Sequence, residues 1–129
     1  MADSLHPYQD FAACHPKLRE AVSEVVAYWE PDAVPITVGF GSIGRALVQL
    51  ESDLDDATLD QVSRLVEHSL SGSGPEADAV ATGLLEAICA QSVRAPSAVA
   101  RVVSRLGADA RAYIRAWDAF TGTTTPGVT

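Results

Sequence analysis

Basic residues are scarce in this chain. It has 9 lysines and arginines against 17 aspartates and glutamates, and its net charge is −8. Such a charge repels the phosphate backbone of nucleic acids and the anionic surface of membranes, so we expect neither as a direct ligand. A basic protein partner, in contrast, would be attracted and its encounter with the chain accelerated.

Long apolar runs and clusters of metal ligands are also missing. No apolar stretch approaches the roughly 20 residues that cross a bilayer, and no signal peptide is recognisable at the start. Cys14 and Cys89 form no CxxC or Cys/His cluster, which predicts two reduced thiols. The three histidines lack the spacing of a metal site. We therefore expect a cytoplasmic protein without metal or cofactor.

No pattern of catalytic residues is recognisable. Serines are frequent, but none lies in a G-x-S-x-G turn, and nothing assembles a nucleophile with a base and an oxyanion site. With 129 residues the chain has the length of one domain and is too short for a two-half dinucleotide fold with a substrate domain. These observations predict a single non-enzymatic domain over residues 1–129.

Helical spacing of apolar residues, interrupted by proline and glycine, fills most of the chain. No alternating run typical of a strand occurs. The pattern predicts an all-α protein of five to six helices, packed as antiparallel hairpins in an irregular bundle or a two-layer solenoid-like arrangement. The helices are expected at 16–30, 42–52, about 55–70, 75–92, 96–106 closed by Gly107, and 108–121, followed by a frayed tail at 122–129.

One glycine-rich segment permits two interpretations. Gly39, Gly41 and Gly44 spell the GxGxxG motif of a dinucleotide-binding turn, the basis of an alternative function as a small nucleotide-binding enzyme. However, the strand that should precede this turn would contain Pro35, which cannot donate to a central ladder. The other interpretation is a bend or a close approach of two helices.

Helical periodicity runs through the same segment and favours the second interpretation. The apolar positions recur at spacings of 4, 3, 4 and 3, at Ile36, Phe40, Ile43, Leu47 and Leu50. Three glycines would each weaken a helix by about 1 kcal/mol relative to alanine. The secure helix is therefore placed at 42–52 with Ser42 as N-cap, and 35–41 stays open between a helical and an irregular lead-in.

Five acids occur within ten residues after this helix, with no base among them: Glu51, Asp53, Asp55, Asp56 and Asp60. We call them the acidic ridge. Asp55 or Asp56 is expected to cap the next helix, which accounts for at least two of the five through capping and the helix dipole. The functional hypothesis is that the ridge meets a basic protein partner.

Aromatic residues gather on the last predicted helix. Arg111, Tyr113 and Trp117 are of the types that most often anchor protein interfaces, so they form a second candidate binding patch. The other interpretation is plain packing of the rings, with Tyr113, Ile114, Trp117 and Phe120 all buried.

Three segments carry a resemblance to a known family. They are Tyr28-Trp29, the stretch Ala81–Ile88 with its Gly-Leu-Leu-Glu, and Leu106–Gly122 with Arg111, Tyr113, Trp117 and Phe120. The chain from about residue 8 to 122 resembles small uncharacterised bacterial all-helical proteins, which are similar to the immunity proteins encoded beside polymorphic toxins. The resemblance implies a small acidic protein that neutralises a toxin domain by binding it. Residues 39–44 depart from the family, where relatives have ordinary amphipathic helix.

Overall fold

The computed structural model describes residues 5–129, so the first four residues of the predicted domain lie outside it. Within this range the protein is all-α, as predicted, and contains no strand. The helices number seven rather than five to six, because the short N-terminal turn is helical and forms α1. Their bounds are α1 Gln9–Ala12, α2 Pro16–Trp29, α3 Ile36–Gln49, α4 Asp56–Ser71, the continuous helix α5 Pro75–Ala79, η3 Val80–Leu85 and α6 Glu86–Cys89, α7 Pro96–Ser104, and α8 Ala108–Thr121.

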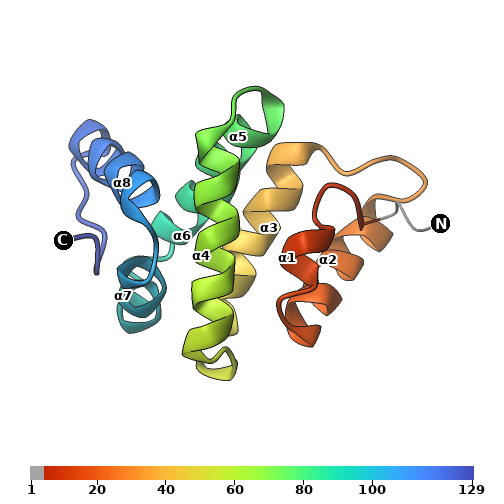
Figure 1. The fold of residues 1–129 in the computed structure, drawn as a ribbon, viewed down its shortest axis with the longest axis horizontal. Helices are drawn as coiled ribbons and strands as arrows, with labels where there is room; N and C mark the ends of the chain where they lie inside the picture. The colour runs from red at the N-terminus through yellow and green to blue at the C-terminus, as the bar shows by residue number, and fades with distance from the viewer. Residues whose placement is uncertain (1–4) are drawn as a thin grey trace.

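The first two helices and the C-terminal segment lie on opposite sides of the molecule. Figure 1 shows α1 and α2 on the right, α3 and α4 in the centre, and α7, α8 and the C-terminus on the left. The core is centred on α3, whose Phe40 and Leu47 are completely buried, and on η3, where Leu84 and Leu85 are equally enclosed. No helix among residues 5–129 is both long and apolar enough to cross a membrane.

Most helix starts follow from local chemistry and were predicted. Pro16 begins α2 at the position where its missing N–H costs nothing, and the ring of His15 accepts the N–H of Lys17. Asp55 caps α4 by accepting the N–H of Thr58 at 2.9 Å, as predicted for Asp55 or Asp56. Pro75 and Pro96 likewise stand in the first turns of α5 and α7.

The glycine segment lies inside α3, which settles residues 35–41 as helix from Ile36 onward. The prediction of Ser42 as N-cap is wrong, because Pro35 holds that position. A methyl group on Gly44 would overlap the carbonyl oxygen of Leu84, and one on Gly39 would overlap the ring of Tyr8. These glycines therefore allow close packing of α3 against η3 and the N-terminal segment.

The crossing partner of α3 is a π-helix. In η3, residues Val80–Leu85 widen the helix by one residue per turn. Gly83 faces α3 there, and a methyl group on it would lie 2.6 Å from the carbonyl oxygen of Thr37. Small residues on both sides thus let two backbones touch, as the packing interpretation predicted. The helix ends at Cys89, earlier than the predicted residue 92.

Gly107 has a different role from the predicted one. It is the N-cap of α8, whereas α7 is capped by Arg105. The carboxylate of Glu67 fills the space beside Gly107 and accepts the N–H groups of Asp109 and Ala110 at 3.1 and 2.9 Å. Because Gly107 has no side chain, an acid from α4 caps α8 across 42 residues of sequence.

The C-terminal tail packs against the fold, so the prediction of a frayed tail is wrong. The carboxylate of Asp118 accepts the N–H of Thr125 at 2.8 Å and its hydroxyl at 2.7 Å. Thr125 and Val128 are buried, and Arg115 donates to the carbonyl oxygen of Val128. Gly127 has a φ of +86°, and its lack of a side chain lets the tail approach Ala100 on α7.

Candidate functional site

Bases from distant parts of the chain neutralise the acidic ridge. Arg101 bonds the Glu51 carboxylate at 2.9 Å, the Glu51 carbonyl oxygen at 2.7 Å and Asp56 at 2.9 Å. Arg105 forms a two-pronged pair with Asp60 at 3.0 and 3.2 Å. Arg105 also pairs with Asp56 at 3.8 Å, and Lys17 of α2 pairs with Asp53 at 3.0 Å, while Asp55 caps α4. Every member of the ridge thus has an intramolecular role.

The electrostatics of the ridge agree with these roles. Hydrogen bonds from Arg105 hold the pKa of Asp60 below its ordinary value, and those of Thr58 do the same for Asp55. The five acids of the ridge and the three bases that pair with it have a summed charge of −2, whereas the whole chain has a net charge of −8. The ridge therefore works chiefly as a clamp that joins α2, α4 and α7.

In the second candidate binding patch, Arg111 is separated from Tyr113 and Trp117. Tyr113 and Trp117 are half-buried, and the Tyr113 hydroxyl donates to Oε2 of Glu86 at 2.6 Å. Arg111 is half-buried elsewhere on α8, with its Nε enclosed and unbonded among residues 5–129. Phe120 was predicted to be buried, but it lies at the outer end of the helix and is 84% exposed.

A hollow of about 420 Å³ opens beside Trp117. It lies between α6, the turn at 90–94 and the start of the tail, and we call it the C-terminal hollow. Its walls are largely apolar and include Glu86, Cys89, Ala90, Val93, Trp117 and Thr123. This size and lining are those of a binding pocket for a side chain or a small molecule.

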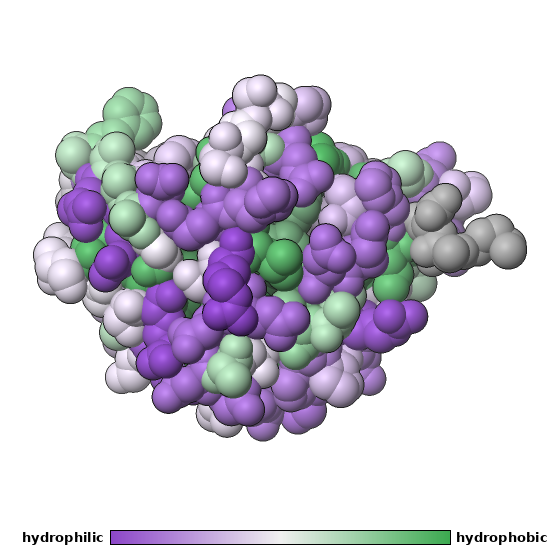
Figure 2. All heavy atoms as spheres, in the orientation of Figure 1, coloured by the Kyte–Doolittle hydropathy of each residue, from purple (hydrophilic) through white to green (hydrophobic). Residues whose placement is uncertain are grey.

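Two large apolar side chains near this hollow are unusually exposed. Val93, in the turn at 90–94, is 95% exposed, and Phe120, whose ring is tilted against Trp117 at 6.4 Å, is 84% exposed. Figure 2 shows apolar side chains projecting beyond α8 at the upper left. We call Val93, Trp117, Phe120 and the C-terminal hollow the C-terminal face.

Two carboxylates lie at the C-terminal face, and neither has a basic partner among the described residues. Glu86 accepts only the Tyr113 hydroxyl, and Asp118 accepts only groups of Thr123 and Thr125. Burial, followed by these two negative charges, raises the pKa of the Cys89 thiol. Burial and the bond to Glu86 raise the pKa of Tyr113. The field at the hollow is thus negative.

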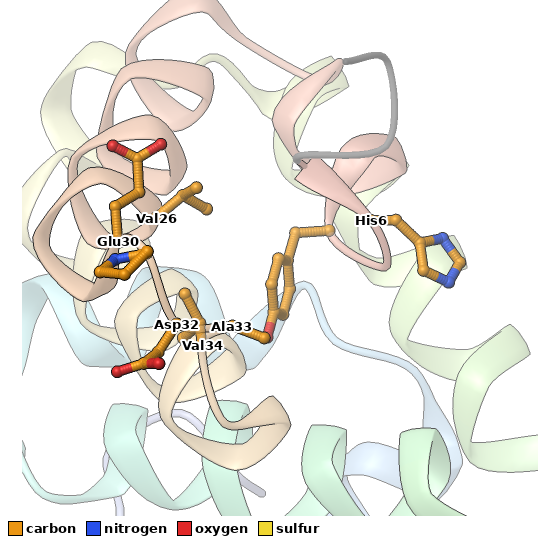
Figure 3. A pocket seen from close by; sticks show the side chains of 8 residues that line it. His6, Val26, Glu30, Asp32, Ala33 and Val34 are labelled. Atoms are coloured by element: carbon orange, nitrogen blue, oxygen red, sulfur yellow. The ribbon is translucent and has the colours of Figure 1, made fainter.

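A second hollow, of about 320 Å³, lies between the N-terminal segment and the connector that follows α2. Figure 3 shows Glu30 and Asp32 on one flank and His6 turned away on the other, so these charged groups do not converge. Tyr8 also lines this hollow, and its buried hydroxyl has no hydrogen-bond partner among residues 5–129. The charged side chains that line this hollow therefore form no common binding point.

The sequence interpretation missed half of the C-terminal face. Neither Glu86 nor Val93 is among the binding residues that the sequence predicts. A signal for Val93 did exist, because a lone β-branched residue stands in the polar turn Gln91-Ser-Val-Arg94 between two helices. No comparable signal existed for Glu86, since its partner Tyr113 is 27 residues away.

The described residues include no group of three or more side chains that could hold a metal ion. The GxGxxG segment has neither the preceding strand nor the open turn of a dinucleotide site. Other protein atoms occupy the space beside Gly39 and Gly44 that a phosphate group would need. Comparisons with protein-family models, curated proteins and solved structures find no match for this chain. The C-terminal face is therefore our candidate site, and the structure alone supports it.

Proposed function

We propose that this protein is a non-enzymatic protein-binding module that engages its partner through the C-terminal face. The observation that carries the proposal is the exposure of Val93, which lines an apolar hollow together with Trp117, and of Phe120, whose ring lies 6.4 Å from that of Trp117. Burying each of these two side chains would contribute about 1.5 to 3 kcal/mol. A partner that covers them recovers that free energy.

The composition of this face supports a protein partner. Tryptophan and phenylalanine are enriched at interface centres, where a few side chains supply most of the affinity. Trp117, an anchor residue of the sequence-based hypothesis, keeps that role here. The acidic ridge does not, because its charges are already held by Lys17, Arg101 and Arg105.

A basic partner suits the charge of the chain. The net charge of −8 accelerates the approach of a cationic protein, and most of that charge lies outside the ridge. Such a partner also fits the resemblance to immunity proteins. A toxin domain encoded by a neighbouring gene is therefore the first class of partner to test.

Affinity capture with matched variants tests the proposal. The bait is the full chain, with neighbouring gene products as prey. Val93→Ser with Phe120→Ser removes the exposed apolar groups, and Tyr28→Ser is the control because Tyr28 is also 84% exposed but lies on α2. We expect a partner that is retained by the control and lost by the double variant.

Two results would contradict the proposal. One is a partner that binds the double variant as well as the wild type. The other is a partner that is lost when the ridge is reversed by Asp53→Lys, Asp55→Lys and Asp56→Lys in a variant whose helical fold is shown to be intact. The second result would show that the acidic ridge is the binding surface.

A further inference from the structure

Glu86 is a charged group that the fold leaves without a counter-charge at the wall of the C-terminal hollow. Its Oε2 accepts the Tyr113 hydroxyl at 2.6 Å, a neutral donor. No ion pair to Glu86 occurs among residues 5–129, and Arg45, which lines the shallow depression on the other side of Glu86, bonds the Ser42 hydroxyl instead. Glu86 therefore has one carboxylate oxygen without a hydrogen bond and no basic partner among residues 5–129.

The surroundings of Glu86 suit a cation on an apolar stem. Trp117 lines the same hollow, and the face of an indole ring attracts cations. Ala90 and Val93 add apolar surface against which methylene groups pack. Asp118 adds a second carboxylate that forms no ion pair in the described part of the chain, and it strengthens the negative field around Cys89.

From these observations we propose that the C-terminal hollow receives a lysine side chain of the partner protein, with its ammonium at Glu86 and its stem against Trp117. This inference rests on the proposed function and names the anchor that the C-terminal face would select. The unpaired carboxylate supplies the charge complementarity, and the apolar walls supply the fit to the stem.

The geometry favours lysine over arginine. A guanidinium gains most from two parallel bonds to both oxygens of a carboxylate. At Glu86 the Tyr113 hydroxyl already occupies one acceptor position of Oε2, so a second donor at that oxygen would have to share it, whereas the other oxygen has no partner among residues 5–129. An ammonium is a compact charge that needs a single acceptor, and it loses nothing in this arrangement.

Three short peptides test the inference on the full-length protein. They are acetyl-Leu-X-Leu-amide, in which X is lysine, arginine or norleucine, and binding is followed by the indole N–H resonance of Trp117. That signal is assigned by its loss in Trp117→Phe, because the chain contains two tryptophans. We expect the lysine peptide to bind about tenfold more tightly than the norleucine peptide, the factor typical of one charge-assisted hydrogen bond.

Three variants separate charge from packing. Glu86→Gln should abolish the preference for lysine over norleucine, whereas Glu24→Gln, which removes an exposed acid from α2, should leave it unchanged. Tyr113→Phe frees the second oxygen of Glu86 and should bring the arginine peptide up to the affinity of the lysine peptide.

The wild-type comparison needs a folded variant only to assign the Trp117 signal. Equal binding of the lysine and norleucine peptides overturns the inference, as does the absence of any shift at Trp117 with the lysine peptide. A lysine preference that survives in a folded Glu86→Gln variant also overturns it. In each case a partner that still depends on Val93 and Phe120 would leave the proposed function standing, and only the anchor would be wrong.

Discussion

The acidic ridge and the C-terminal face use carboxylates in opposite ways. The ridge has five acids within ten residues, yet Lys17, Arg101 and Arg105 reach them from 36 to 50 positions away. The C-terminal face has only Glu86 and Asp118, and both are bonded to neutral groups alone among the described residues. The comparison teaches that a high density of acids in a sequence does not identify the charges that remain free in the fold.

The largest expected effect is on partner binding at the C-terminal face. Val93→Ser with Phe120→Ser should weaken binding by about 3 kcal/mol or more, at least roughly a hundredfold, because each apolar side chain contributes at least about 1.5 kcal/mol when it is buried. The melting temperature should stay unchanged, since both side chains are exposed. Isothermal titration with the captured partner measures the affinity. A drop in melting temperature without a loss of affinity would contradict the prediction, because Val93 and Phe120 would then contribute to stability and not to binding.

A smaller effect concerns the tail that borders the C-terminal hollow. Asp118→Ala removes the acceptor of Thr123 and Thr125 and should lower the free energy of unfolding by about 1.5 kcal/mol. Hydrogen exchange at the Thr125 amide should become fast. Thr125→Val, which removes only the hydroxyl, should have a smaller effect. Unchanged protection of that amide in Asp118→Ala would show that Asp118 does not hold the tail.

At the ridge the expected effect is on stability. Arg101→Met breaks the bonds to Glu51 and Asp56 and should lower the free energy of unfolding by about 1 kcal/mol, since the guanidinium is partly exposed. Urea unfolding at low salt and at 1 M NaCl should show the loss shrinking as salt screens the pairs. Arg94→Met, an exposed residue without an ion pair in the described chain, is the control and should have no effect.

The two regions should also differ in their response to pH. The pKa of Asp60 is lowered in the folded state, so its contribution is present above its ordinary pKa and is lost as pH falls through the folded value. The pKa of Tyr113 is raised, so its contribution is present below its ordinary pKa of 10.0 and is lost as pH rises through the folded value. The stability difference between wild type and Asp60→Asn should vanish in acid, and that for Tyr113→Phe should decrease in alkali. Urea unfolding across pH measures both, and parallel curves would contradict these assignments.

Much of the fold was predictable because the residues that begin its helices act through local interactions. Pro16, Pro75 and Pro96 begin helices, and Asp55 caps one, so the sequence places most helix starts closely. The helical spacing of apolar residues between positions 36 and 50 also favoured a helix over a nucleotide-binding turn, in spite of the glycines that weaken a helix. What propensity could not show was the benefit of those glycines, which appears only where Gly83 and the Leu84 backbone meet α3.

The candidate site was predictable only in part, for a physical reason. Trp117 is of a residue type that anchors interfaces, and it does line the C-terminal hollow. The charge state of the surface depends on pairs between distant residues, such as Arg105 with Asp60 across 45 positions, which no local pattern contains. The same holds for the tail, because Thr125 and Val128 are buried by contacts with α7 and α8 that composition does not indicate.

A hydrogen-exchange footprint of the complex tests the central claim most directly, because it compares both regions in one experiment. The account predicts that the partner adds protection at residues 86–93 and 117–124, while residues 51–60 exchange as they do in the free protein. New protection at 51–60 with none at the C-terminal face would contradict the account and make the acidic ridge the binding surface.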